Sequence, residues 1–468
     1  MFVVMALVTT VATTPLTKAL YPPWYQKKVE RWRRGEIDWD GNEIDDPPSS
    51  RGESTPKLDG TQIRRLMVYL RLDSLPGLFT FLTLLQPEKE ARAPVVEATV
   101  EPPPEDGPVQ KNGTPLEVHG LRIIELTDRT SSVMHVTEGE EFYSQRDPVV
   151  NAFRAFSQLH DLAVAGRVAV VPEDSYADTL VTQASEISSD FALIPWGEYG
   201  SVTEDQSVPF TINATERFKG PTHLEFVHEA LRKARSICNT GVFIDNGFGG
   251  ITKPTGQTEL ARTASSVSIR SFRGRAARPV ADKSHHIFFP FIGGADDRAA
   301  LKIVLQLAKN PHVTVSVVHI NWPVEGEEAE GGRQGSEMAA TQARNDKREV
   351  ERDITAQDLA LLSLLQGSLP RGLSGRVVFS EVSVPPNAVL TETVALAKKL
   401  VGQTPRNAGD MVVLGRRHAR LGDSMAAEVL SGLPDLRSAV GKMTEQLVAA
   451  SVKASILVIQ AGGRSLEV

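Results

Sequence analysis

Two glycine-containing turns are the part of this sequence whose residue types could bind a phosphate group. The residues concerned are Gly293, Gly294 and Asp296 in the first turn and Gly415, Arg416 and Arg417 in the second. Glycines let backbone N–H groups approach an anion, a helix N-terminus adds a favourable field, and an arginine can pair with the charge. The turns therefore predict a ligand site for a nucleotide such as AMP or ATP, in which Asp296 and Asp297 would be unfavourable neighbours.

A second interpretation of these turns stays open. The glycines would then only allow tight turns, and the arginines would cover an interface between two halves of the chain. A GxGxxG or Walker A motif would favour the nucleotide interpretation, but the sequence contains neither.

Other residue patterns do not predict catalysis or metal binding. The sequence contains no CxxC, HExxH or GxSxG motif. His285 and His286 are adjacent at the start of an expected strand, so their side chains point to opposite faces and cannot hold one metal ion. We therefore expect no catalytic residue, no metal site and no enzymatic activity.

The elements around the first turn form a predicted β-α-β unit. Residues 287–292 and 313–320 are short apolar runs typical of buried strands. Between them, apolar residues recur at helical spacing, and Asp296 or Asp297 is placed to cap that helix. Tight turns between these elements predict parallel strands covered on both faces.

The same order of elements occurs twice along the chain. Residues 62–250 and 285–463 each read as five strands with alternating helices, and each has an insertion after its second strand. We therefore predict an α/β fold with two tandem, doubly wound, five-stranded parallel sheets. In such a sheet, ligands bind beyond the carboxyl ends of the strands, where both glycine turns would lie.

Composition limits the class of protein. The chain has 468 residues, 41% of them hydrophobic, with a formal net charge of −7. This charge argues against a nucleic-acid partner. The single cysteine, Cys238, excludes an internal disulfide framework and suits a reducing compartment.

The N-terminus has the character of a membrane boundary. Residues 1–14 are apolar and uncharged but shorter than the roughly 20 residues that a spanning helix needs. Aromatic and basic residues follow, including Trp24, Tyr25, Lys27 and Lys28. This order is typical of the cytosolic end of a membrane helix. The alternative is a buried N-terminal helix of a soluble protein.

These patterns predict five segments. They are a membrane-helix remnant at 1–20, a linker at 21–60, a first α/β domain at 61–251 with a disordered insertion at 87–115, a basic linker at 252–283, and a second α/β domain at 284–464 with a disordered insertion at 324–345.

Three stretches resemble a known family. MALVTTVATTPLTKALYPPWYQKK resembles the end of the last transmembrane helix in monovalent cation:proton antiporters of the second group. LRLDSLPGLFTFLTLL and HHIFFPFIGGADDRAALKIVLQLAKN resemble the cytosolic tail of the fungal potassium/proton antiporter. The resemblance implies tandem universal-stress-protein-like domains, a homodimer, and a partner transmembrane domain that carries the ion-binding aspartates and is not in this sequence.

The leading hypothesis is therefore a cytosolic regulatory tail of a potassium/proton antiporter, involved in cation and pH homeostasis. It would lie at an endomembrane, Golgi or plasma membrane, with most of the chain on the cytosolic side. The alternative hypothesis is a soluble nucleotide-binding protein of the universal-stress type. The turn sequence from Gly415 begins the glycine motif of that type without completing it at the usual spacing.

Overall fold

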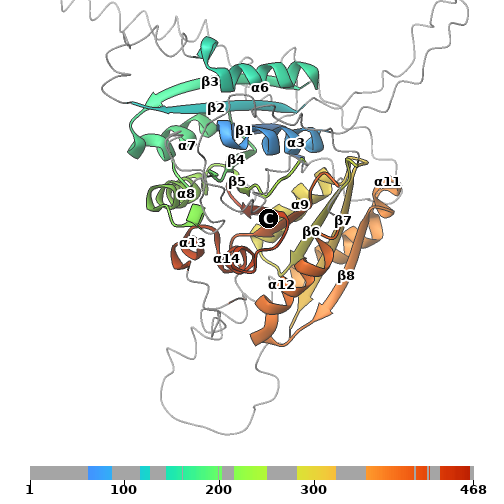
Figure 1. The fold of residues 1–468 in the computed structure, drawn as a ribbon. Helices are drawn as coiled ribbons and strands as arrows, with labels where there is room; N and C mark the ends of the chain where they lie inside the picture. Colours follow the sequence, from blue (N-terminus) through green and yellow to red (C-terminus); the bar gives the residue numbers. More distant parts are fainter. Residues whose placement is uncertain are drawn as a thin grey trace, which may run out of the picture. The chain divides into compact units, whose positions relative to one another are not determined.

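The described part of the chain forms three layers, with helices on both faces of one large sheet (Figure 1). The structure is a computed structural model, and it describes residues 62–86, 116–126, 144–160, 162–198, 200–202, 216–249, 282–322, 355–404, 407–418, 421 and 433–463. The chain divides into two units, Met1–Lys57 and Leu58–Val468, and all of the described residues belong to the second. The expected membrane-helix remnant, both predicted disordered insertions and most of both linkers lie outside the described residues.

Within the described residues, the first half contributes five strands and four longer helices. The strands are β1 (Arg65–Tyr69), β2 (Glu117–Glu125), β3 (Ala163–Val171), β4 (Phe191–Pro195) and β5 (Asn239–Ile244). The helices are α3 (Leu75–Leu85), α6 (Pro148–Leu159), α7 (Tyr176–Glu186) and α8 (Pro221–Ala234).

The second half repeats this plan. Its strands are β6 (His285–Phe291), β7 (Val313–Asn321), β8 (Val377–Ser383), β9 (Met411–Gly415) and β10 (Ser455–Gln460). Its helices are α9 (Ala295–Leu307), α11 (Arg371–Ser374), α12 (Val389–Leu400), α13 (Pro434–Val440) and α14 (Lys442–Ala449), and residues 355–368 are also helical.

Both halves have the same strand order, and they share one sheet. The order is β3-β2-β1-β4-β5-β10-β9-β6-β7-β8. If the strands of each half are numbered along the chain, both halves have the order third, second, first, fourth, fifth from the outer edge of the sheet to its middle. Every pairing within a half is parallel, and β5 pairs antiparallel with β10 where the halves meet. The predicted α/β class and the two parallel five-stranded halves are confirmed.

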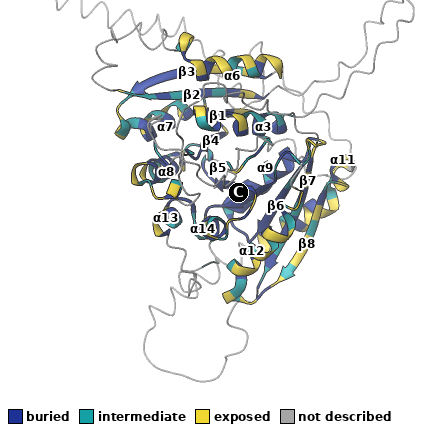
Figure 2. Cartoon of the chain, in the orientation of Figure 1, coloured by how far each residue is buried: buried dark blue, intermediate teal, exposed yellow. Residues whose placement is uncertain are grey.

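Strand sequences reflect their places in this sheet. The central strands β4, β9 and β10 are buried at every residue, because helices cover both of their faces. The outermost strands β3 and β8 contain exposed positions (Figure 2). On one face the core packs under α3, α6, α9 and residues 355–368, and on the other under α7, α8, α12, α13 and α14.

One helix expected from the sequence is broken. Periodicity predicts a single helix from Asp435 to Ala450, whereas the structure ends α13 at Val440 and begins α14 at Lys442. Gly441 between them has a φ of 94°, which a residue with a side chain rarely adopts. Among the described residues, no helix is long and apolar enough to cross a membrane.

Candidate functional site

The structure brings the two predicted glycine turns together. The first turn follows β6, the second follows β9, and these strands are hydrogen-bonded neighbours. We call the space between the turns the second-half crevice. Gly293 and Gly294 have φ angles of 109° and 107°, so both need the conformational freedom of glycine. The backbone is therefore arranged as the sequence predicts, at the carboxyl end of the sheet.

Asp297 lies between the two turns and is hydrogen-bonded to both. Its Oδ2 accepts hydrogen bonds from the N–H groups of Ile292 (2.9 Å) and Gly293 (2.8 Å), and its Oδ1 accepts one from Gly415 (2.9 Å). Its side chain is fully buried. The expectation that Asp296 or Asp297 caps α9 is wrong, because no side-chain cap is made. Asp297 instead ties the two turns together.

Asp296 accepts hydrogen bonds from the chain just beyond two other strands. Its Oδ1 accepts from Ala461 N–H (2.8 Å), just beyond β10, and its Oδ2 accepts from Arg417 N–H (3.0 Å). Burial raises the pKa of Asp296, while these two hydrogen bonds lower it by a smaller amount. The side chain therefore links three strand ends.

Asp358 is a third carboxylate, and it is not among the site residues predicted from the sequence. It lies in the helix at 355–368, and its Oδ2 accepts from Gly294 N–H (2.9 Å). Its Oδ1 accepts from Arg298 at 2.8 Å. Burial raises its pKa despite these partners. The sequence does contain an indication of this role. Asp358 lies on the same helical face as Leu362 and Leu365, where an apolar residue is expected, so a carboxylate there indicates a buried partner.

The chain's own carboxylates therefore take the N–H groups that a phosphate would need. Three aspartates accept from six backbone donors, which are the N–H groups of Ile292, Gly293, Gly294, Gly415, Arg417 and Ala461. A Cβ placed on Gly293 would lie 2.6 Å from Asp358 Oδ2, so little space separates this turn from the carboxylate. A phosphate here would displace an acceptor and meet negative charge. The residues present do not fit a nucleotide phosphate.

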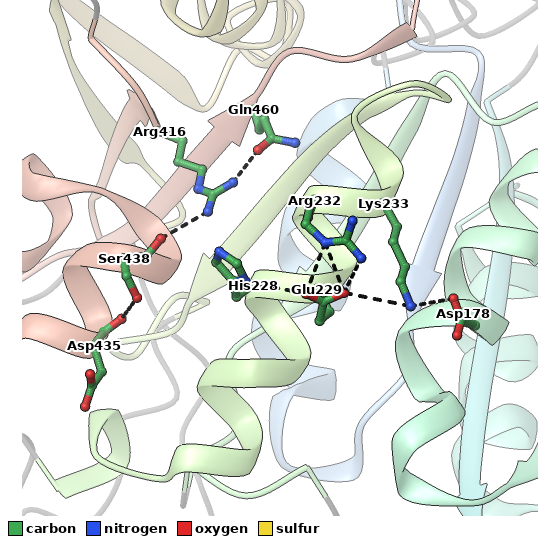
Figure 3. A network of polar contacts seen from close by, with 9 residues as sticks. All are labelled: Asp178, His228, Glu229, Arg232, Lys233, Arg416, Asp435, Ser438 and Gln460. Atoms are coloured by element: carbon green, nitrogen blue, oxygen red, sulfur yellow. Dashed lines mark hydrogen bonds and ion pairs between the residues drawn. The ribbon is translucent and has the colours of Figure 1, made fainter.

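The Arg416 side chain points toward Gln460 and Ser438, as Figure 3 shows. Its guanidinium donates to Gln460 Oε1 and to the Ser438 carbonyl. Gln460 in turn donates to the Leu231 carbonyl of α8, in the first half. Burial lowers the pKa of Arg416 to about 10. This arrangement agrees with the second interpretation, in which an arginine covers the interface between halves.

The equivalent crevice of the first half is also closed by internal polar contacts. The buried Arg71 donates to Asp73 and to the Val202 carbonyl, and Asp73 accepts from Glu198 N–H at 2.8 Å. His223 Nε2 accepts from Gly197 N–H at 3.3 Å. Burial, with a smaller contribution from Arg71, lowers the pKa of His223 to about 3. This histidine is therefore neutral near pH 7.

Comparison with known proteins relates this chain to cation/H(+) antiporters. A family described as a plant cation/H(+) antiporter domain matches residues 118–248. Cation/H(+) antiporter 18 of Arabidopsis thaliana is 24% identical over 329 residues, covering 67% of this chain and 31% of that protein. Cation/H(+) antiporter 17 of the same plant is 24% identical over 216 residues, covering 43% of this chain and 22% of that protein. The chain thus spans less than a third of the length of these relatives.

The relatives support the antiporter family in general rather than its fungal member, since these proteins are from a plant. Among solved structures, a universal stress protein from Archaeoglobus fulgidus DSM 4304 has a TM-score of 0.36 and 12% identity, covering 86% of this chain and 98% of that one. A functionally unknown protein from Pseudomonas aeruginosa PAO1 has a TM-score of 0.35 and 11% identity, covering 85% and 92%. At these TM-scores the likeness adds nothing to the topology described above.

Proposed function

We propose that this chain is the cytosolic regulatory tail of a monovalent cation/proton antiporter. The supporting observation is the similarity of 67% of the chain to Cation/H(+) antiporter 18. In this proposal the cation is potassium, and the tail contributes to cation and pH homeostasis. We further propose that it lies beside a membrane, of the endomembrane system, the Golgi or the cell surface; the apolar and then basic-aromatic sequence at the N-terminus supports this.

The tail would act through its shape rather than through chemistry. Its buried carboxylates accept from backbone N–H groups, whereas a catalytic pair would hold a nucleophile against a base. We therefore propose a structural partner for a transmembrane antiporter domain, working as a homodimer, with no enzymatic activity, cofactor or nucleic-acid partner.

A chimera tests this proposal. The segment of Cation/H(+) antiporter 18 that matches this chain is replaced with this chain, and cation-dependent proton movement is measured in membrane vesicles. We expect exchange that differs from that of the antiporter with the segment deleted. A chimera made with the destabilising variant Leu457→Ala serves as a control, because Leu457 is fully buried in the shared sheet. A chimera that is expressed equally well but behaves like the deletion would refute the proposal.

The alternative, a soluble nucleotide-binding protein, lacks support from the geometry of the second-half crevice. Its backbone donors already have carboxylate partners. Calorimetry of the full chain with AMP and ATP separates the two functions: we expect no heat of binding. Saturable binding that is lost when Gly415 is changed to Val would favour the nucleotide function instead.

A further inference from the structure

The helix at residues 355–368 has an exposed side without charged residues. On its buried side, Asp358 accepts from Gly294 N–H and from Arg298, and Leu362 and Leu365 pack into the core. Asp358 is the one charged residue of this helix. We call the opposite side the uncharged helix face, and its exposed residues are Ala356, Gln357, Leu359, Ala360, Ser363, Leu364, Gln366 and Gly367.

This face differs from an ordinary solvent-exposed helix face, which carries charged residues. The helix α12 has such a face, since its exposed residues include Glu392, Lys398 and Lys399. On the uncharged helix face, Leu359 is instead 46% exposed and Leu364 45% exposed. Exposed leucines on a surface without charges are typical of a contact with another protein, because the centre of such a contact is depleted of charged residues.

The residue types on the uncharged helix face occur in the same order in both chain directions. From either end the order is small, Gln, Leu, small, small, Leu, Gln, small. At about 3.6 residues per turn, the four small residues form a central stripe about 60° wide, with one leucine and one glutamine on each flank. Turning the helix end for end therefore presents the same kinds of side chain at the same levels. A twofold contact between identical chains needs a self-complementary surface of this kind.

We propose that two copies of this chain associate through the uncharged helix face, with the two helices antiparallel about a twofold axis. Ala360 of one copy then lies level with Ser363 of the other, and Ala356 lies level with Gly367. Small side chains in both stripes let the two backbones approach closely, and Leu359 packs over Ser363 of the second copy. The glutamines lie at the rim, and no charge has to be removed from water.

The size of this contact indicates weak association of free chains. It covers about three helical turns and is therefore smaller than a standard stable interface, which buries roughly 800 Å² on each partner. Two tails attached to one antiporter dimer would be held at a high effective concentration, so weak pairing would be sufficient there. That use rests on the homodimer of the proposed function, whereas the pairing itself is a property of the chain alone.

Engineered cysteines in the full chain test the antiparallel pairing. In the pair, position 360 of one helix lies about 4.5 Å along the axis from position 360 of the other, and position 356 lies about 16 Å from its counterpart. A disulfide needs Cα atoms within about 7 Å. We therefore expect oxidation to give a covalent dimer of Ala360→Cys and none of Ala356→Cys. A mixture of A356C and Gly367→Cys should cross-link, and a Cβ at position 367 has nothing within 4 Å.

The unmodified chain is the control for oxidation. Its single cysteine, Cys238, is buried, and burial raises the pKa of the thiol to about 12, so it should form no disulfide. Sedimentation equilibrium at increasing concentration adds a reversible measurement. Ala360→Glu should weaken association by roughly tenfold or more, because two carboxylates would meet at the centre of the contact. Ala395→Glu, a matched change at an exposed position of α12, should leave association unchanged.

Three outcomes would overturn the pairing. The first is no covalent dimer of A360C, with a wild-type chain that stays monomeric at about 1 mM. The second is equal cross-linking of A356C and A360C. The third is an A360C thiol that neither cross-links nor reacts with a maleimide, which would mean that another part of the same chain covers the face. Each leaves the antiporter tail to be decided by the chimera, so the two proposals can fail separately.

Discussion

At the scale of single residues, His223 is a neutral group held where a charge is unfavourable. It is fully buried, Arg71 lies close by, and its Nε2 accepts from Gly197 N–H. Its Nδ1 has no hydrogen-bond partner among the described residues. A protonated ring would lose the bond from Gly197 and face the guanidinium of Arg71.

His223 should make the fold sensitive to acid. Its pKa is lowered from 6.5 to about 3 in the folded chain, so the unfolded chain binds the proton first as pH falls. Its stabilising effect is complete above pH 6.5 and is lost between there and about pH 3. We expect the free energy of unfolding to fall by up to about 1.4 kcal/mol per pH unit in that interval. Chemical denaturation of the full chain at a series of pH values measures this slope.

The variant His223→Gln assigns the slope to this residue. Glutamine keeps an acceptor for Gly197 N–H but does not titrate, so H223Q should show a shallower pH dependence than the wild type. His228→Gln, on the same helix, should leave the slope unchanged because that ring is 46% exposed. Parallel curves for the wild type and H223Q would show that His223 is not responsible.

Gly415 offers a test of how tightly the crevice is closed. A Cβ at this position would lie 2.5 Å from Asp297 Oδ1 and 3.0 Å from Asp297 N. Gly415→Ala should therefore destabilise the chain by about 1–3 kcal/mol, because the carboxylate cannot move without losing its other donors. Gly372→Ala is the control, since nothing lies within 4 Å of that position. Denaturation midpoints of the two variants should differ, and matching midpoints would mean that the crevice is open.

Residue types and spacing are enough to predict where the glycine turns lie. They do not predict which acceptor groups bind the backbone N–H groups of these turns. Gly293 and Gly415 are recognisable because a strand ends at each. In the sequence, Asp297 looks like a helix N-cap. An N-cap residue and a residue that accepts hydrogen bonds from neighbouring turns both follow a strand directly, so the sequence does not distinguish them. Asp358 lies 64 positions along the chain from Gly294, whose N–H group it accepts from, so only the tertiary structure reveals the contact.

At the scale of elements, the clearest departure from periodicity is the break between α13 and α14. The apolar spacing continues through Gly441, and a lone glycine inside a helical pattern is usually tolerated. Here a Cβ on Gly441 would lie 2.2 Å from the Arg416 carbonyl. The break therefore lets the chain pass closely beside the turn that carries Arg416, a contact that no local pattern encodes.

Gly441→Ala should be costly for two reasons. Alanine at a φ of 94° is strained by about 1–3 kcal/mol, and its Cβ would collide with backbone rather than with a movable side chain. We expect a lower melting temperature and weaker hydrogen-exchange protection in α13 and α14. Gly367→Ala, where nothing lies within 4 Å, should melt close to the wild type. A G441A variant as stable as G367A would contradict the strained geometry.

At the scale of the whole molecule, the halves are joined more closely than the repeat alone predicts. Residues 61–251 and 284–464 were expected as separate domains, and their boundaries stay a prediction, but the fifth strands of both halves pair within one sheet. The composition of the two fifth strands indicates that they pair with each other. As free edges, β5 and β10 would need charged residues or proline to prevent aggregation, yet NTGVFI and SILVIQ contain neither.

A shared sheet predicts that both halves unfold together. Leu457 of β10 pairs with Phe243 of β5, and both side chains are fully buried. Leu457→Ala should cost about 2–5 kcal/mol, as truncation of a core leucine does. Because the cavity lies between the halves, strands β1–β4 should lose hydrogen-exchange protection as much as β6–β9 do.

The control for this prediction is Val378→Thr on the outermost strand β8. The Val378 side chain is 59% exposed, so this substitution should change the free energy of unfolding by less than about 0.5 kcal/mol. Two separate unfolding transitions in the wild type, or a loss of protection in L457A confined to the second half, would show independent domains. One transition that shifts as a whole would show that the two halves unfold as a single cooperative unit through the shared sheet.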